Sequence, residues 1–94
     1  MAKLIVRHRV ANYETWKAVF DGMTELRKRH GWIGHTLVRD AADANLLTVI
    51  NHVKDLAGAK AYGGSPELRE GMSRAGVQGP PDVTFCEEIE DRTY

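Results

Sequence analysis

The sequence contains a single cysteine, Cys86, which excludes an intrachain disulfide. No apolar run approaches the roughly 20 residues that span a bilayer. Residues 3–10 are too short and too charged to serve as a signal peptide. Lys plus Arg and Asp plus Glu number 13 each and are interspersed, which argues against nucleic acid or a membrane surface as a partner. We therefore expect a cytoplasmic protein.

Motifs for nucleotide, phosphate or dithiol chemistry are also missing. The chain has no Gly-x-Gly-x-x-Gly, no Walker loop and no Cys-x-x-Cys. Its four histidines include no His-x-His or His-x3-His pair, so we expect no metal site. With 94 residues the chain is predicted to form one domain, residues 1–94, that buries only about 60 to 65% of its unfolded surface. A core this thin would benefit from a second copy.

Residues 3–10 alternate in the manner of a half-buried strand and include a histidine on the apolar side. One face carries Leu4, Val6, His8 and Val10, and the other carries Lys3, Ile5, Arg7 and Arg9. An imidazole on the apolar face of a first strand is a candidate for the floor of a small pocket.

The remaining elements follow from periodicity, capping residues and turn formers. A helix over residues 13–29, capped by Asn12, is followed by strands over 32–39 and 46–53, which the turn-forming residues 40–45 connect as a hairpin. Asp55 caps a second helix that Gly63-Gly64 interrupts and that Ser65 and Pro66 restart toward residue 75. Residues 77–82 are predicted to be a loop and 83–90 a last strand.

The order βαββαβ predicts an α+β, ferredoxin-like fold: a four-stranded antiparallel sheet, both helices on one face, and the second helix broken. The uncovered face would then expose Ile5, Ile33, Leu37 and Ile50, more apolar surface than monomers usually show. We therefore expect a homodimer packed sheet to sheet.

The faces of the hairpin follow from an expected pairing of Arg39 with Leu46. This register puts Ile33, His35, Leu37, Thr48, Ile50 and His52 on the uncovered face, and Trp32, Gly34, Thr36, Val38, Leu47, Val49, Asn51 and Val53 on the face toward the helices. Since His8 falls on the helix face, it would not share a metal with His35 and His52. These two could instead meet their copies across the dimer interface. The pair Arg39-Asp40 is expected to form an ion pair or to cap the hairpin.

Five short motifs accompany this layout: Asn12-Tyr13-x-x-Trp16, Arg39-Asp40, Asp55-Leu56-x-x-Ala59-Lys60, Ser65-Pro66-x-Leu68-Arg69 and Ala75-Gly76-Val77. With them the chain resembles the antibiotic-biosynthesis-monooxygenase-like proteins of the dimeric α/β-barrel superfamily. That superfamily includes cofactor-free monooxygenases, haem-degrading enzymes, lactone isomerases, polyketide cyclases and proteins without known activity, so fold alone decides little.

The resemblance disfavours haem degradation. Haem-degrading relatives have an asparagine on the first strand, a tryptophan at the end of the third and a haem-ligating histidine on the second helix. This chain has His8, Val53 and Met72 at those positions, so we expect no cofactor. The same alignment implies that the face holding His8 lines a cleft beneath the helices.

The predicted cleft has apolar walls and few polar groups, as a small aromatic or polyketide-like ligand requires. The walls are Trp16, Phe20, Met23, Leu68 and Met72, and the polar contributors are His8, Asn51, Thr36 and Tyr62. His8 would act as general base, with Asn51 or Tyr62 stabilising the resulting enolate or phenolate. A cofactor-independent monooxygenase, a cyclase and an isomerase would all use these groups.

A second interpretation stays open. The protein would be a non-catalytic dimeric binding or structural module, with His8 hydrogen-bonded into the core and Trp16, Phe20, Tyr62 and Met72 packed as core residues. The two interpretations differ in whether an open cavity reaches His8.

Overall fold

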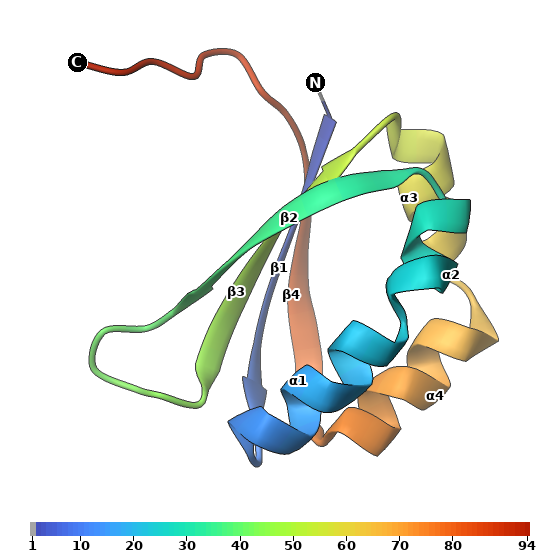
Figure 1. Ribbon diagram of the computed structural model, residues 1–94, viewed down its shortest axis with the longest axis vertical. Coiled ribbons are helices and arrows are strands. Elements are labelled where there is room, and N and C mark those ends of the chain that lie inside the picture. The colour runs from blue at the N-terminus through green and yellow to red at the C-terminus, as the bar shows by residue number, and fades with distance from the viewer. Residues whose placement is uncertain (1) are drawn as a thin grey trace.

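The computed structural model describes residues 2–94 and has the predicted βαββαβ order, in which each α consists of two helical segments (Figure 1). The elements are β1 Ala2–Val10, α1 Tyr13–Gly22, α2 Thr24–Arg29, β2 Trp32–Arg39, β3 Leu46–Val53, α3 Leu56–Gly63, α4 Pro66–Ala75 and β4 Val77–Glu87. The sheet has the order β2-β3-β1-β4, and every neighbouring pair is antiparallel. All helices lie on one face, which confirms the ferredoxin-like prediction.

Side-chain caps begin three of the helical segments at the predicted residues. Asn12 Oδ1 accepts from the amide of Thr15 at 2.9 Å, and Asp55 Oδ1 accepts from that of Gly58 at 2.8 Å. Ser65 Oγ accepts from the amide of Leu68 at 3.2 Å. Each such cap stabilises its helix by about 1 kcal/mol, so the break between α3 and α4 lies where the sequence placed it.

The first helix is also broken, contrary to the prediction of one helix over 13–29. The break falls at Met23, whose amide donates to the carbonyl of Phe20 at 3.2 Å. The hydroxyl of Thr24 donates to the carbonyl of Asp21 at 2.7 Å. Gly22, a weak helix former, and the side-chain hydroxyl of Thr24 thus end one segment and start another.

The predicted loop over 77–82 was wrong, because β4 begins at Val77 and ends at Glu87 rather than at residue 90. Val77 pairs with Val10, directly after Gly76 takes the left-handed conformation at φ 79°. The prolines 80 and 81 are tolerated because β4 is an edge strand and a register shift interrupts its pairing with β1.

A bulge in β2 corrects the predicted faces of the hairpin. Trp32 pairs with Val53 but Gly34 pairs with His52, so one extra residue stands in β2 and Arg39 faces Leu47 rather than Leu46. Because side chains alternate between the two faces of a sheet, one extra residue moves every later side chain of the strand to the opposite face. The predicted faces of five residues are therefore wrong: His35 and Leu37 lie on the helix face, and Gly34, Thr36 and Val38 lie on the uncovered face.

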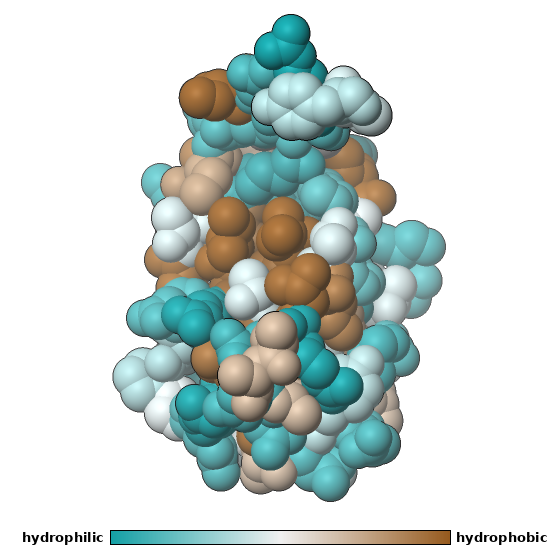
Figure 2. Space-filling view, turned by 90° about the vertical axis from the view of Figure 1, so that its left-hand side faces the viewer, coloured by the Kyte–Doolittle hydropathy of each residue, from teal (hydrophilic) through white to brown (hydrophobic). Residues whose placement is uncertain are grey.

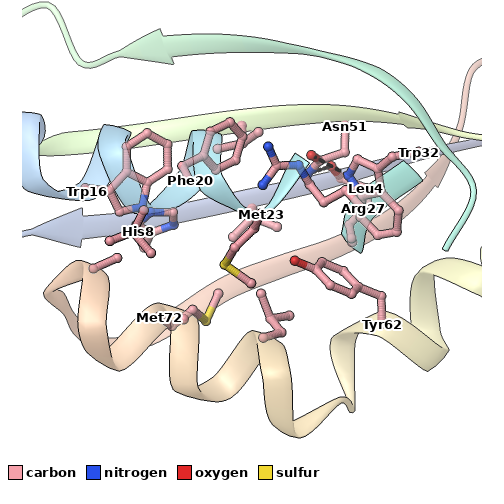
Figure 3. A pocket seen from close by; sticks show the side chains of 16 residues that line it. Leu4, His8, Trp16, Phe20, Met23, Arg27, Trp32, Asn51, Tyr62 and Met72 are labelled. Carbon is pink, nitrogen blue, oxygen red and sulfur yellow. Dashed lines mark hydrogen bonds between the residues drawn. The ribbon is translucent and has the colours of Figure 1, made fainter. Parts of the chain in front are cut away.

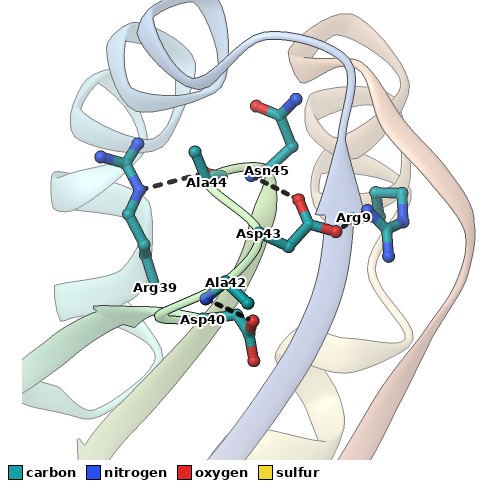
Figure 4. A network of polar contacts seen from close by, with 7 residues as sticks. All are labelled: Arg9, Arg39, Asp40, Ala42, Asp43, Ala44 and Asn45. Carbon is teal, nitrogen blue, oxygen red and sulfur yellow. Dashed lines mark hydrogen bonds and ion pairs between the residues drawn. The ribbon is translucent and has the colours of Figure 1, made fainter.

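Polar contacts close the hairpin between β2 and β3 (Figure 4). Arg39 Nε donates to the carbonyl of Ala44 at 3.0 Å, Asp40 Oδ2 accepts from the amide of Ala42 at 3.0 Å, and Asp43 pairs with Arg9 of β1. Arg39 therefore caps the hairpin, one of the two roles expected for it.

Two buried clusters form the core between the sheet and the helices. The first contains Leu4, Trp32, Val53, Ala59 and Tyr62, and the second contains Val10, Trp16, Leu47, Val49 and Ala75. Alternate residues of β3 are buried, as expected for a strand with one covered face.

The other face of the sheet is uncovered, and Figure 2 shows an apolar patch at its centre, flanked by hydrophilic residues. Ile5 pairs with Ile50 and Ile50 with Thr36, and Val38 on the same face is 44% exposed. Within residues 2–94 no helix has the length and apolar character needed to cross a membrane.

Candidate active site

A cavity of about 80 Å³ lies between the sheet and the helices, between the two core clusters (Figure 3). Its wall comes from β1, β2 and β3 on one side and from all four helical segments on the other. The lining residues are Leu4, Val6, His8, Trp16, Val19, Phe20, Met23, Arg27, Trp32, Val49, Asn51, Tyr62, Leu68, Gly71, Met72 and Ala75.

His8 is a buried imidazole on this wall. It is 6% exposed, and neither ring nitrogen has a hydrogen-bond partner within residues 2–94. Its ring centroid lies 5.5 Å from that of Trp16. Burial lowers the pKa of His8 below its ordinary value of 6.5, so the ring is neutral at pH 7 and can accept a proton.

Asn51 is held by two buried hydrogen bonds. Its Oδ1 accepts from the indole N–H of Trp32 at 2.8 Å, and its Nδ2 donates to the backbone carbonyl of Leu4 at 3.0 Å. These bonds fix the orientation of both Asn51 and Trp32.

An aromatic stack forms the wall above His8. The rings of Trp16 and Phe20 are stacked with centroids 4.7 Å apart, and His35 contacts Phe20 edge-on at 5.0 Å. Residues 16 and 20 are one helical turn apart, which places both rings on the face of α1 that covers the sheet.

Arg27 and Tyr62 contribute polar groups to a wall that is otherwise mostly apolar. Arg27 is 5% exposed, and its guanidinium carbon lies 3.8 Å from the centroid of the Phe20 ring. Burial raises the pKa of Tyr62, and the neighbouring guanidinium of Arg27 opposes that rise. The sequence analysis did not single out Arg27 as a site residue. Its spacing of seven from Phe20 and four from Met23 was the signal that it faces inward.

Two methionines, Met23 and Met72, limit the present size of the cavity. Gly71 makes room for Met23, because a Cβ there would collide with the end of the Met23 side chain. Methionine side chains are unbranched and repack readily, so the cavity can enlarge when they move.

Eight of the nine predicted cleft residues line this one cavity: His8, Asn51, Trp16, Phe20, Met23, Tyr62, Leu68 and Met72. Their roles remain predictions. Thr36 does not belong to the cavity. It is exposed on the uncovered face, with its hydroxyl 3.4 Å from Nε2 of His52, because the β2 bulge turns it away from the helices.

The same bulge separates His35 from His52. His35 packs on Phe20 at the helix face, so the expectation that His35 and His52 together meet their copies on the uncovered face was wrong. Within residues 2–94 no group of three or more His, Cys, Asp or Glu side chains is placed to hold a metal ion.

The architecture is that of the antibiotic biosynthesis monooxygenase-like proteins, as the motifs suggested. No family model matches the sequence, and no curated protein matches it. The solved structures that it resembles include the cofactor-independent oxygenase SnoaB from Streptomyces nogalater, with 16% identity, a TM-score of 0.77, and coverage of 96% of this chain and 94% of SnoaB.

Two further structures show the same fold. An antibiotic biosynthesis monooxygenase is 13% identical with a TM-score of 0.71, and 96% of this chain covers 100% of that one. Rv0793 from Mycobacterium tuberculosis is 17% identical with a TM-score of 0.69, and 98% of each chain is covered. At these identities the similarity establishes the shared fold, and the activity has to be argued from the cavity.

Proposed function

We propose that the protein binds a small aromatic or polyketide-like molecule in the cavity and that His8 acts on it as a general base. The observation that carries this proposal is the position of His8 on the cavity wall, with both ring nitrogens free of protein partners within residues 2–94. A buried polar group without a partner destabilises a fold by about 1–3 kcal/mol. Such a group is therefore more readily explained by function than by packing.

The chemistry begins with proton transfer. Neutral His8 takes a proton from a phenol or from an acidic C–H next to a carbonyl, and the ligand becomes a phenolate or an enolate. The Tyr62 hydroxyl, which Figure 3 shows pointing into the cavity, donates a hydrogen bond to the developing oxyanion. Asn51 holds Trp32 in place at the same end.

Three reactions can follow from that anion. Reprotonation at another carbon is an isomerisation, and addition to a carbonyl of the same molecule is a cyclisation. Reaction with O₂ converts a CH₂ group to C=O and releases water, as a cofactor-independent monooxygenase does. The similarity to SnoaB, a cofactor-independent oxygenase, supports testing the third reaction first.

Ligand binding requires adjustment of the cavity. Its present volume of about 80 Å³ is below the roughly 300–1,000 Å³ of typical ligand pockets. Movement of Met23 and Met72 is the change that the packing permits most easily. When a substrate binds, the cavity wall would thus lose contacts with the methionine thioethers and gain contacts with the ring of the substrate.

The alternative, a non-catalytic dimeric binding or structural module, requires a role for His8 in the core. Such a role would be a hydrogen bond to a neighbouring strand or helix, and the imidazole has none within residues 2–94. The free nitrogens favour the catalytic proposal over this alternative.

We also infer that the chain forms a homodimer through its uncovered sheet face. Ile5, Ile50 and Val38 are apolar residues of that face. Covering this patch with a second copy would remove it from water.

Tryptophan fluorescence offers a direct binding test, because both tryptophans of the chain, Trp16 and Trp32, line the cavity. We would titrate naphthols, hydroxynaphthoquinones and hydroxyanthrones, and then follow oxygen uptake and products by mass spectrometry. We expect His8→Gln to bind within a few-fold of wild type and to lose about 10²-fold or more in turnover.

The matched control is Arg29→Met, since Arg29 is exposed on α2 and does not line the cavity. It should retain both quenching and turnover. Quenching by none of these compounds would contradict the ligand class. Turnover that survives His8→Gln would contradict the role of His8.

A further inference from the structure

Arg27 is a buried cation without a buried anion. It is 5% exposed, and no carboxylate within residues 2–94 forms an ion pair with it. Arginine keeps its charge in proteins. A lone buried charge is costly, and a partner of opposite charge offsets that cost.

The contacts that Arg27 does make are neutral. Its Nη2 donates to the hydroxyl of Thr24 at 3.3 Å, and its guanidinium lies over the ring of Phe20 at 3.8 Å. The phenol of Tyr62 is its other polar neighbour, and burial raises the pKa of that phenol, which keeps it protonated. Neither hydroxyl supplies the negative charge that the guanidinium lacks.

Arg27 and Tyr62 point into the cavity from one end, and His8 lies at the other (Figure 3). Tyr62 belongs to the core cluster around Leu4, whereas His8 contacts Trp16 of the second cluster. Leu4 and His8 are four residues apart on β1, or roughly 13 Å at 3.3 Å per residue. The proton acceptor and the phenol of Tyr62 therefore address different parts of a bound molecule. The guanidinium of Arg27 lies over Phe20, which packs against the second cluster.

An outer groove leads to the same guanidinium. It has a volume of about 350 Å³ and shares Arg27 and Trp32 with the inner cavity. Lys28 is among its other lining residues, so a negatively charged ligand approaching here meets a second cation beside Arg27.

We propose that Arg27 and Tyr62 form an oxyanion site, and that the ligand of this cavity is an aromatic molecule with an ionised oxygen held there as a phenolate or enolate. The inference rests on the proposed function and names its substrate class. It also makes Arg27 the group that stabilises the charge which proton removal creates. A guanidinium donates charge-assisted hydrogen bonds, which are stronger than those of a neutral amide.

The test uses 4-nitrophenol, whose neutral and anionic forms absorb differently, and 4-nitroanisole as its counterpart that cannot ionise. Quenching of Trp16 and Trp32 reports binding, and the visible spectrum of the nitrophenol reports its ionisation in the complex. We expect wild type to bind the phenolate more tightly than the neutral phenol, so that the bound nitrophenol ionises at a lower pH than in solution.

Arg27→Met should weaken phenolate binding by about 10-fold to 100-fold and return the ionisation of the bound nitrophenol to its solution pH or above. Binding of nitroanisole should not change. Arg29→Met removes a charge from the same helix at an exposed position and should alter neither probe. His8→Gln should keep the preference for the phenolate, which separates this site from the proposed base.

If Arg27→Met lost binding of both nitrophenol and nitroanisole, Arg27 would have a structural role and the inference would be overturned. Thermal unfolding of that variant provides the check, since we expect its Tm to be at or above that of wild type. Equal binding of nitroanisole and nitrophenolate by wild type would overturn the oxyanion site and leave the aromatic cavity standing. Binding of neither probe would overturn both.

Discussion

The indole N–H of Trp32 donates to the side-chain oxygen of Asn51 at 2.8 Å, beneath the helices and on the wall of the cavity. Trp32 is the first residue of β2, directly before the bulge, and Asn51 lies on β3. The bond thus ties the irregular start of an edge strand to a central strand. It fixes the end of the cavity at which Arg27 and Tyr62 lie.

Asn51→Ala should destabilise the fold by about 2–4 kcal/mol, because it leaves the Trp32 N–H and the Leu4 carbonyl unpaired in a buried place. Urea unfolding followed by circular dichroism measures this loss. Thr48→Ala is the control, since Thr48 is on the same strand but on the uncovered face. Equal stability of the two variants would contradict the role given to Asn51.

His8 should make the fold sensitive to mild acid. Burial lowers its pKa in the folded state, so the unfolded chain binds more protons once the pH falls below about 6.5. The free energy of unfolding is then highest above that pH and falls by at most about 1.4 kcal/mol per pH unit below it. Urea titrations from pH 8 to pH 5 measure the slope.

His35 must be removed first in that experiment. Its pKa is also lowered, by burial and then by the positive charges of Arg27 and Lys17. In a His35→Gln background, we expect His8→Leu to reduce the slope and to raise stability at pH 7 by about 1–3 kcal/mol, since it removes unpaired polar atoms. A drop in stability at pH 7 would mean that His8 serves the core.

Periodicity and capping predicted most of the fold because these signals are local. Asn12, Asp55 and Ser65 each carry a side-chain oxygen at the start of an apolar helical pattern, and each caps the expected segment. The alternation in β1 likewise placed His8 beneath the helices, where eight of the predicted cleft residues meet.

The errors came from features that depend on pairing between strands. One extra residue at Ile33 exchanged the faces of the later β2 side chains and moved Thr36 out of the site. The sequence of residues 32–39 does not show that Ile33 is skipped in the pairing with β3. Pro80 and Pro81 indicated a loop, but they lie in an edge strand, which only the sheet order reveals. Arg27 was missed because a basic residue in the last turn of a helix already has an explanation.

Gly58 should resist substitution, because a Cβ there would lie 2.7 Å from the backbone carbonyl oxygen of His30. Gly58→Ala is therefore expected to destabilise the protein by about 1–3 kcal/mol, since helix α3 would move away from the turn before β2. Gly22→Ala is the matched control, because nothing lies within 4 Å of its added methyl. Alanine lowers the backbone entropy of the unfolded chain, which should stabilise the fold by about 0.4–1 kcal/mol. Chemical unfolding measures both. Similar values for the two variants would show that the contact with His30 does not constrain α3.

The inferred dimer predicts different effects for two equally exposed valines on opposite faces of the sheet. Val38 is 44% exposed on the uncovered face, and Val83 is 45% exposed on the face toward the helices.

Sedimentation velocity of the wild type should show a dimer at micromolar concentration. Val38→Glu should shift it toward monomer, because a carboxylate would be buried between two sheets. Val83→Glu should leave the dimer intact, since the interface does not include that side. A wild-type monomer, or equal dissociation by both substitutions, would contradict packing through the uncovered face. The patch around Ile5 and Ile50 would then face water in the working protein.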